Sequence, residues 1–353
     1  MIVAMPAKPN ESATLRQVAK QAGVHLSTAS RALDPERRHL ISRDIVARVE
    51  AAARTVGWRP NRAAASLRRG RSKAIGVLIP DMANLVTAQI MQGVETAIVS
   101  RGFFPLVVST RATPAKAVVD RLLWQRVEGV VDASGDADMA RALAKADVPT
   151  VLTARADPEG LFSSVHADRE CAANLAIDHL YALGHRAIAV LASPQDIQLS
   201  IDRLNFCLAA LARHGLQPAA VAIADASTRD AGLRALEPLL AQRAPQGPHH
   251  FTAVCAANDL LALGAYEAAR KAGLTVPHDV SVVGQNDMLM ADLVSPPLTT
   301  VRLQHYDMGR QAGDLLIEEI EARLSNEGTP RPPRVIVFRP EFVVRESTAA
   351  PSA

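Results

Sequence analysis

Polar side chains that could bind a small molecule stand just past the ends of short apolar segments. They are Asp81, Arg203, Asn258, Asp259, Asn286 and Asp287. If the apolar segments are parallel strands, these groups gather at the carboxyl edge of a sheet, the usual ligand site of an open α/β fold. Two of them have another explanation, because Asn258 could merely cap a helix over residues 260–271 and Arg203 could form a surface salt bridge.

A second set of side chains, near the N-terminus, could contact nucleic acid. Helical periodicity places Leu26, Ser27, Ser30 and Arg31 on one outward face of a short helix. Hydroxyl groups and arginine can contact base edges, and Arg31 is long enough to reach a guanine edge or a phosphate. Such a face is what a recognition helix presents to the major groove of DNA.

Three short helices would position that face. Thr14 and Gln17 form a capping-box pattern that starts the first helix, and Gly23 supplies the turn after it. Ser42 is a suitable N-cap for a third helix that stops at Gly57. The inward positions are apolar: Leu15, Val18, Ala19, Ala22, Ala29, Ala32, Leu33, Ile45, Val46, Val49, Ala53 and Val56. The pattern predicts a helix-turn-helix domain.

The charge of the chain is distributed unevenly. Residues 1–73 carry 15 Lys and Arg against 5 Asp and Glu, a net charge of +10, whereas the rest carries 24 against 31, a net charge of −7. A basic module on a larger acidic body is typical of a polyanion-binding domain attached to a regulatory or catalytic partner. A solvated basic tail would have the same charge, but this segment has helical patterning.

The last part of the basic segment, residues 61–73, has the composition of a linker. Its alanines favour a helix that is too short to be stable alone, so we expect it to order on binding. Its cations could meet phosphates; they are Arg62, Arg68, Arg69, Arg71 and Lys73. A solvated basic linker between two domains is the alternative.

From residue 74 onward, short apolar segments alternate with helical ones. The expected strands are 74–80, 104–108, 129–131, 149–153, 187–193, 251–256 and 280–284. Continuous apolar strands separated by helices predict buried parallel sheets. About 270 such residues exceed one comfortable sheet, so we expect two lobes with a cleft between them.

Several classes of protein are disfavoured by the composition of the 353-residue chain. No apolar run approaches the ~18 residues of a membrane span and no secretory signal is recognisable, so we expect a cytoplasmic, nucleoid-associated protein without membrane contact. The cysteines Cys171, Cys207 and Cys255 lie far apart, and the histidines lack metal-ligand spacing, so we expect no metal, cofactor or disulfide. Motifs of phosphate-binding loops, hydrolases and dinucleotide sites are absent, which argues against an enzyme.

Motifs spread over the whole chain carry a family resemblance. They are T-L-R-Q-V-A-K-Q-A-G-V-H-L-S-T-A-S-R-A-L (14–33), G-W-R-P-N (57–61), A-A-A-S-L (63–67), A-N-D (257–259), G-Q-N-D (284–287), P-P-L-T-T-V (296–301) and E-F-V-V-R-E-S-T (341–348). Together they resemble the LacI/GalR family of bacterial transcription regulators. His25 departs from the family, which usually has a serine as the N-cap of the recognition helix.

The resemblance implies which residues contact DNA. They are Thr14, His25, Leu26, Ser27, Thr28, Ser30, Arg31, Asn61, Arg62, Ala64, Leu67 and Arg68. In the family, the hinge helices of a dimer enter the minor groove together, and Leu67 occupies the position of a leucine that opens the central base step. Unstacking that step lets the duplex bend around more protein.

The resemblance also implies an effector site. Its residues in this chain are Asp81, Thr87, Arg203, Asn258, Asn286 and Asp287. In the family, the positions of Arg203, Asn258 and Asn286 hydrogen-bond a small molecule. Residues 86–87 replace an aromatic pair that often stacks on a sugar or base, and Ala154 replaces an aspartate. Fewer carboxylates and a retained Arg203 favour an anionic ligand, such as a sugar acid or sugar phosphate.

These observations predict five parts of the chain. They are a disordered N-terminal tail (1–12), an all-α helix-turn-helix domain (13–60), a hinge (61–73), an effector-binding domain (74–346) and a short tail (347–353). The effector-binding domain is expected to have two Rossmann-like α/β lobes, similar to periplasmic binding proteins. By analogy, the N-lobe takes about 74–160 with 294–325 and the C-lobe about 161–293 with 327–346, with crossings near Leu161, Leu293 and Asn326.

The functional prediction is a ligand-responsive repressor of a carbohydrate or sugar-acid utilisation operon. A homodimer would bind double-stranded, pseudo-palindromic operator DNA, because one recognition helix reads only a short half-site. The residues after Glu346 lack heptads, so nothing supports a coiled-coil tetramer, although a tetramer is not excluded. The alternative is a cytoplasmic sugar-binding or sugar-processing α/β protein with an accessory DNA-binding module. The sequence leaves the effector open.

Overall fold

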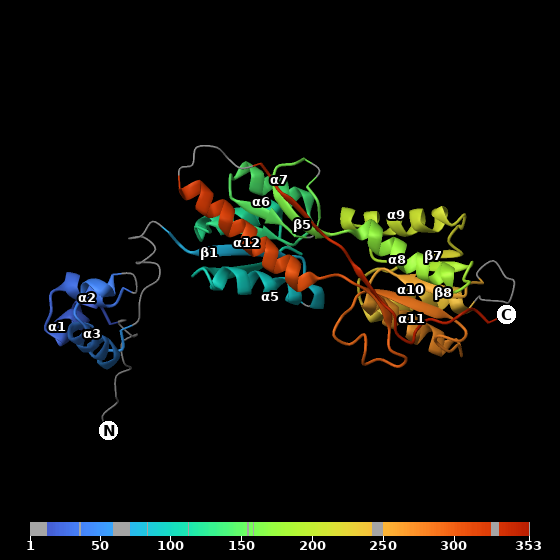
Figure 1. Ribbon diagram of the computed structural model, residues 1–353, viewed down its shortest axis with the longest axis horizontal. Helices are drawn as coiled ribbons and strands as arrows, with labels where there is room; N and C mark the ends of the chain where they lie inside the picture. The colour runs from blue at the N-terminus through green and yellow to red at the C-terminus, as the bar shows by residue number, and fades with distance from the viewer. Residues whose placement is uncertain are drawn as a thin grey trace, which may run out of the picture. The chain divides into compact units, whose positions relative to one another are not determined.

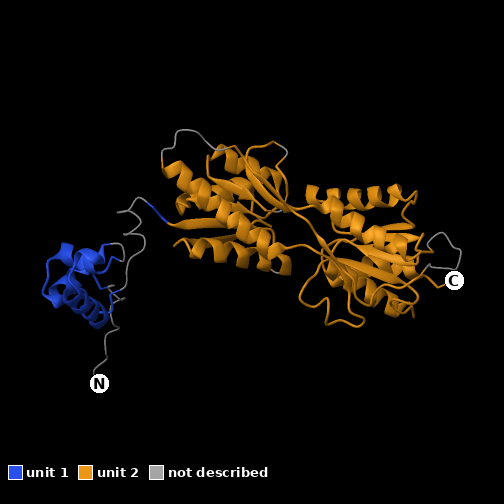
Figure 2. Cartoon of the chain, viewed as in Figure 1, with its two compact units in different colours: residues 1–72 blue, residues 73–353 orange. Residues whose placement is uncertain are grey.

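The protein consists of two compact units, residues 1–72 and 73–353 (Figure 2). The computed structural model describes residues 13–34, 37–58, 71–82, 84–111, 113–153, 155–157, 159–241, 250–325 and 332–352. The N-terminal tail, most of the predicted hinge and residue 154 lie outside this part of the chain. The same holds for five predicted DNA contacts, namely Asn61, Arg62, Ala64, Leu67 and Arg68.

The first unit is a bundle of three helices. These are α1 (Leu15–Ala22), α2 (Leu26–Ala32) and α3 (Arg43–Thr55), with a 3-10 turn, η1 (Arg38–Leu40), before α3. Thr14 and Gln17 make both hydrogen bonds of the capping box, and Gly23 ends α1 with a φ of 61°. Ser42 occupies the N-cap of α3, but its side chain makes no capping hydrogen bond. Small apolar side chains fill the core, and the predicted helix-turn-helix is confirmed.

The second unit contains two six-stranded sheets (Figure 1). The order in the first sheet is β11 (Val335–Phe338), β5 (Ser163–Ala167), β4 (Thr150–Leu152), β3 (Gly129–Asp132), β1 (Ala74–Ile79), β2 (Phe104–Ser109). The order in the second is β12 (Glu341–Val343), β10 (Thr299–Arg302), β9 (Ser281–Asn286), β8 (Ala253–Ala256), β6 (Ile188–Ala192), β7 (Ala220–Ile223). Neighbouring strands are parallel except for the antiparallel pair β10 and β12.

Each sheet is packed between helices, which gives two α/β lobes. The first lobe has α5 (Leu85–Val99), α6 (Ala115–Trp124), α7 (Ala137–Lys145) and α12 (His305–Leu324). The second has α8 (Arg169–Ala182), α9 (Gln198–Arg213), α10 (Arg229–Ala241) and α11 (Asp259–Lys271). Every residue of β1 and β6 is buried, as expected of continuous apolar strands in parallel sheets. The predicted fold class is confirmed.

Two glycines allow α5 and α12 to pack closely. A Cβ on Gly93 would lie 2.0 Å from the carbonyl oxygen of Tyr306, and one on Gly309 would lie 2.1 Å from that of Ile90. No side chain fits at either distance, so both positions require glycine. The close contact holds α12 against α5. The first turn of α12 begins directly after the chain returns from the second lobe to the first.

The passages of the chain between the lobes lie later in the sequence than expected. β5 belongs to the first sheet, so the first passage follows Ala167 and is not near Leu161. β10 belongs to the second sheet, so the second passage follows Arg302 and is not near Leu293. The third lies between β11 and β12, beyond the expected Asn326. The prediction was wrong because β5 and β10 contain Ser, His and Thr and therefore lack a continuous apolar pattern.

The C-terminal residues 347–352 are packed against the second lobe and are not a free tail, contrary to expectation. Ser347 is fully buried. Its hydroxyl donates to a carbonyl of β9 at 2.6 Å and accepts an N–H of β10 at 2.8 Å. The carbonyl oxygen of Ala349 lies 2.9 Å from Nε2 of His185, a residue that is 1% exposed. The segment consists of small residues, Ser, Thr, Ala and Pro, so the sequence offered no strong apolar signal of burial.

Candidate functional site

The predicted DNA-contacting side chains of the first unit lie on its surface. His25, Leu26, Ser27 and Arg31 are exposed on α2, and Thr14 is exposed at the start of α1. Thr28 and Ser30 are half-buried. The structure therefore gathers five hydrogen-bonding side chains and one apolar side chain on a single short helix and its N-cap.

His25 performs the capping role for which serine is usual. Its Nδ1 accepts a hydrogen bond from the backbone N–H of Ser27 at 3.3 Å and lies 2.7 Å from Oγ of the same residue. A neutral imidazole that accepts at Nδ1 carries its proton on Nε2, so the free end of the ring is a donor. The cap thus holds α2 in place and adds an aromatic donor beside the helix N-terminus.

In the second lobe, three predicted residues lie near the carboxyl ends of neighbouring strands. Nη1 of Arg203, on α9 after β6, donates to the carbonyl oxygen of Ala257 at 2.8 Å, just past β8. Asn258 follows in the chain and caps α11, because its Oδ1 accepts from the N–H of Leu261 at 2.8 Å. The cap uses only the side-chain oxygen, so the amide NH₂ of Asn258 can still donate to a ligand. Asn286 ends β9, the strand next to β8.

Asn286 and Asp287 adopt unusual backbone conformations at this point. Their φ angles are 111° and 54°, in a region that non-glycine residues rarely enter. Oδ1 of Asn286 lies 3.3 Å from Nε2 of His305, at the start of α12. The carboxylate of Asp287 is bound by two guanidinium groups, those of Arg302 and Arg345, each at 2.7 Å. Asp287 therefore holds the loop in place, while Asn286 turns toward the passage between the lobes.

Asp259 holds the same loop through hydrogen bonds of its buried carboxylate. Its carboxylate accepts from the backbone N–H of Met288 at 2.7 Å and from the hydroxyl of Thr300 at 2.6 Å. Burial raises the pKa of Asp259 to about 7. The sequence places this residue among the ligand contacts, but its hydrogen bonds position the backbone around Asn286.

Two basic side chains that the sequence prediction missed lie beside these residues. They are Arg169, the first residue of α8, and His305. Burial lowers the pKa of His305 to about 3, and the charges of Arg169 and Arg203 add to the effect. Burial, followed by the charge of Arg203, lowers the pKa of Arg169 to about 9. His305 contacts a predicted residue directly, since its Nε2 lies 3.3 Å from Oδ1 of Asn286.

The first lobe contributes fewer polar candidate residues than the second lobe. Asp81 follows β1 as predicted, but it forms an ion pair with Arg111. Thr87 is buried in the first turns of α5, a helix capped by Asn84. Asp132, at the end of β3, is also buried, and burial raises its pKa to about 6. These residues lie near the point where β1 separates β2 from β3, which is the expected binding position in such a sheet.

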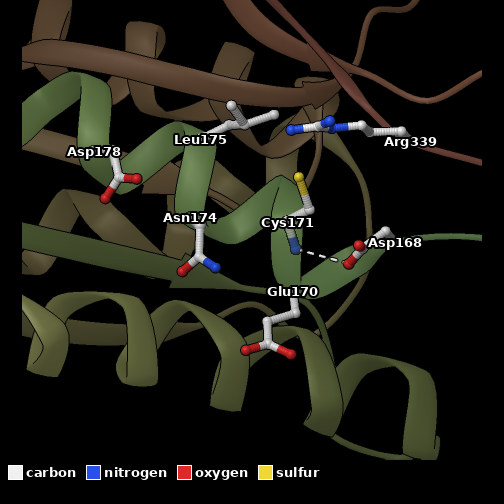
Figure 3. A pocket seen from close by; sticks show the side chains of 7 residues that line it. All are labelled: Asp168, Glu170, Cys171, Asn174, Leu175, Asp178 and Arg339. Carbon is white, nitrogen blue, oxygen red and sulfur yellow. Dashed lines mark hydrogen bonds between the residues drawn. The ribbon is translucent and has the colours of Figure 1, made fainter.

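Two hollows of about 320 Å³ occur in the described part of the second unit. One lies between α5 and the loop after β9; its lining is Leu85, Val86, Ala88, Gln89, Gln92, Asn286, Met288 and Leu289. The other is an open groove beside the first turns of α8 (Figure 3); its lining is Asp168, Glu170, Cys171, Asn174, Leu175, Asp178 and Arg339. The first hollow includes a predicted contact, Asn286, whereas the groove includes none.

Some functions lack support in the described residues. Within the described ranges, no three His, Cys, Asp or Glu side chains are grouped so as to hold a metal ion. No helix of this part of the chain is long and apolar enough to cross a membrane.

The chain is similar to proteins of established function along its whole length. Residues 14–61 match a family described as "Bacterial regulatory proteins, lacI family", and residues 177–348 match "Periplasmic binding protein-like domain". The HTH-type transcriptional repressor CytR of Escherichia coli (strain K12) is 31% identical over 98% of this chain and 99% of its own length.

Solved structures show the same likeness. The Lac repressor dimer bound to operator and the anti-inducer ONPF has a TM-score of 0.83 at 28% identity, with 96% of this chain and 100% of that chain covered. A complex of the transcriptional regulator CelR with cellobiose has a TM-score of 0.70 at 30% identity, with 95% and 99% covered.

Proposed function

Because the chain belongs to the LacI family of bacterial transcription regulators, a non-enzymatic family, we propose that a small molecule in the cleft of its second unit controls operator binding. The observation that carries the proposal is the presence, in one chain, of an exposed recognition face and of Arg203, Asn258 and Asn286 at adjoining strand ends. Transcriptional repression is the function that the chain shares with its family, and the control by a small molecule is what we propose.

The proposed DNA complex is a homodimer on a pseudo-palindromic operator, formed in the cytoplasm. The Lac repressor structure, a dimer on its operator, supports this arrangement. The proposed base and phosphate contacts are Thr14, His25, Leu26, Ser27, Thr28, Ser30, Arg31, Asn61, Arg62, Ala64, Leu67 and Arg68. The dimer matters because two half-sites increase both affinity and specificity over one.

Within that complex, Leu67 is the proposed minor-groove wedge and Arg69 a phosphate contact. Leu67→Ala should weaken operator binding and reduce DNA bending, because an apolar wedge no longer unstacks a base step. Arg69→Ala should instead weaken all DNA sequences alike and lower the salt dependence by about one phosphate contact. Circular-permutation gel shifts and salt titrations separate the two effects, and undiminished bending by the Leu67 variant would refute the wedge.

The proposed effector is a sugar, a sugar acid or a sugar phosphate, and the regulated genes form a carbohydrate utilisation operon. The CelR complex with cellobiose supports the sugar class. Proposed direct contacts are Arg203, Asn258, Asn286 and Thr87. Asp81 and Asp287 are already bound by arginines, so we propose that they contact the effector only from the edge of the site.

The test is an operator titration with the full-length chain in the presence of a library of sugars, sugar acids and sugar phosphates. A true effector should change operator affinity by about 5- to 150-fold, the usual range of such coupling. Arg203→Gln should still bind the operator and lose this response. A parent protein whose operator affinity is unchanged by every compound that binds the second unit would contradict the proposal.

A further inference from the structure

We propose that Cys207 and Cys255 are a redox-active thiol pair, which a peroxide oxidises to a disulfide that joins α9 to β8. Both are free thiols in the structure. The sequence predicts no disulfide because the two cysteines lie far apart in it, but the fold brings them together. The inference assigns a covalent modification site to the second unit and does not depend on the identity of the effector.

The first observation is a hydrogen bond that fixes α9 relative to β8. Nη1 of Arg203 donates to the carbonyl oxygen of Ala257, just past β8, at 2.8 Å. Because α9 connects β6 to β7, and both are parallel to β8, the helix runs antiparallel to β8. Cys207 lies one helical turn after Arg203, about 6 Å along the helix. Cys255 lies two residues before Ala257, about 7 Å along the strand in the same direction. The two cysteines are therefore level with each other.

The second observation is that both side chains point into the space between α9 and the sheet. Cys207 is 6% exposed and Cys255 is 4% exposed, and both belong to one core cluster. Val190 of β6, the strand on which α9 packs, is in register with Cys255 and belongs to the same cluster. The residues on either side of Cys255, Val254 and Ala256, belong to a different cluster. The two thiols form a hydrogen bond with each other, which is the contact that this placement requires.

The surroundings of the two thiols give them different roles. The hydrogen bond with Cys255 lowers the pKa of Cys207 against the effect of burial, and the charge of Arg203 lowers it further. The same hydrogen bond, together with burial, raises the pKa of Cys255. Because the thiolate is the nucleophile, Cys207 reacts first with the peroxide and Cys255 resolves the product.

Hydrogen peroxide supplies the oxidising equivalents for this bond. The sulfur of the Cys207 thiolate attacks one oxygen, the O–O bond breaks, and hydroxide leaves and takes up the proton that the thiol released. The product is a sulfenic acid. The sulfur of Cys255 then attacks the sulfenic sulfur, the S–O bond breaks, and the hydroxide leaves as water with the proton of the Cys255 thiol. Two thiols and one peroxide thus give one disulfide and two water molecules.

The position of the bond gives it a role in the second unit. A disulfide holds its sulfurs at about 2.05 Å, closer than two hydrogen-bonded thiols, so its formation draws α9 and β8 together. The bond lies one helical turn from Arg203 and three residues before Asn258, two side chains that we propose as effector contacts. Only this statement of proximity to the effector rests on the proposed function.

Oxidation of the full-length chain with hydrogen peroxide tests the pair directly. Protein is first reduced with dithiothreitol and separated from it, and free thiols are counted in the unfolded chain before and after peroxide treatment. The parent should fall from three free thiols to one, and dithiothreitol should restore all three. Mass spectrometry of peptides should identify a link between Cys207 and Cys255.

Cys171→Ser is the matched control, because Cys171 lies on α8 and is less buried than the pair. This variant should lose both of its thiols as the parent does. Cys255→Ser should stop at a sulfenic acid on Cys207, which dimedone labels. Cys207→Ser should leave Cys255 reduced at the same peroxide concentration. Circular dichroism of each reduced variant checks that it folds.

A link between Cys207 and Cys255 in the parent supports the inference. Retention of all three thiols by the parent would overturn it, and so would a disulfide that forms only through Cys171, within one chain or between two. Equal dimedone labelling of Cys255 in Cys207→Ser and of Cys207 in Cys255→Ser would refute the assigned order of reaction. Operator binding by the reduced parent is measured separately, so its loss would refute the proposed function and leave the thiol pair standing.

Discussion

Among single residues, Arg31 is the most important for the proposed recognition of DNA. The side chain is exposed on the outer face of α2, and the core of the unit forms without it. Arg31→Ala should therefore leave folding intact and remove about 1–3 kcal/mol of discrimination at one base pair of each half-site. Footprinting against operator and mutated operator measures this loss.

The control for that experiment is Arg48→Ala, which removes another exposed arginine, from α3. The control variant should keep the selectivity of the parent even if it loses some affinity for all DNA. If Arg31→Ala retained both the affinity and the selectivity of the parent, the assignment of α2 to the major groove would be wrong.

His305 makes a separate prediction about pH. Its pKa is about 3 in the folded protein, because of burial and then of Arg169 and Arg203, against about 6.5 when exposed. The unfolded chain thus binds more protons between these values, and the contribution of His305 to stability is lost as the pH falls below 6.5. Between pH 6.5 and 5 the free energy of unfolding should fall by up to about 1.4 kcal/mol per pH unit from this group.

His305→Gln isolates this effect from other titrating groups. Asp259, with a pKa of about 7, contributes a slope of the opposite sign, because the folded protein binds its proton more readily. The slope of the parent alone is therefore not diagnostic. Urea unfolding of both proteins at pH 7 and pH 5 measures the change in the free energy of unfolding. This change should be less favourable for the parent than for the variant, and equal changes would contradict the buried neutral histidine.

At the scale of elements, the C-terminal segment is an integral part of the second lobe. Deletion of residues 347–353 removes the two hydrogen bonds of the Ser347 hydroxyl and leaves buried His185 without the carbonyl of Ala349. At about 1 kcal/mol for each bond, with more for an unsatisfied buried group, the loss should be about 3 kcal/mol. Deletion of residues 352–353 alone removes an exposed bond and is the control. Equal unfolding midpoints for the two truncations would show that the segment contributes nothing.

The elements also show what the sequence could predict. The helices of the first unit were predictable because caps, turn glycine and apolar periodicity are local signals. Strands such as β1, β6 and β8 were predictable because they are continuously apolar. β5 and β10 were not, since their serine, histidine and threonine side chains are buried by tertiary contacts that no local pattern records.

The same limit applies to the candidate site. Arg203, Asn258 and Asn286 could be named as candidates because they follow recognisable strands. His305 contacts Asn286, but it follows β10, a strand without an apolar pattern, so the rule about strand ends did not reach it. Asp287 fits the rule, but its binding by two arginines depends on residues 15 and 58 positions further along the chain.

At the scale of the whole molecule, charge divides the two functions. The segment 1–73, with a net charge of +10, attracts the DNA backbone, whereas the remainder, with a net charge of −7, is repelled by it. The charge that favours DNA is therefore concentrated in the segment that contains the lacI family match, residues 14–61.

We expect this chain to recognise a defined, symmetric operator, and selection from random duplex DNA by the full-length protein is the decisive experiment. Sequences recovered after several rounds should share two inverted half-sites, with centres about 10 base pairs or a multiple of it apart, as a dimer of recognition helices requires. Protein carrying Arg31→Ala should not enrich this motif. Recovery of no common motif by the parent, or of a single unsymmetric site, would contradict the account.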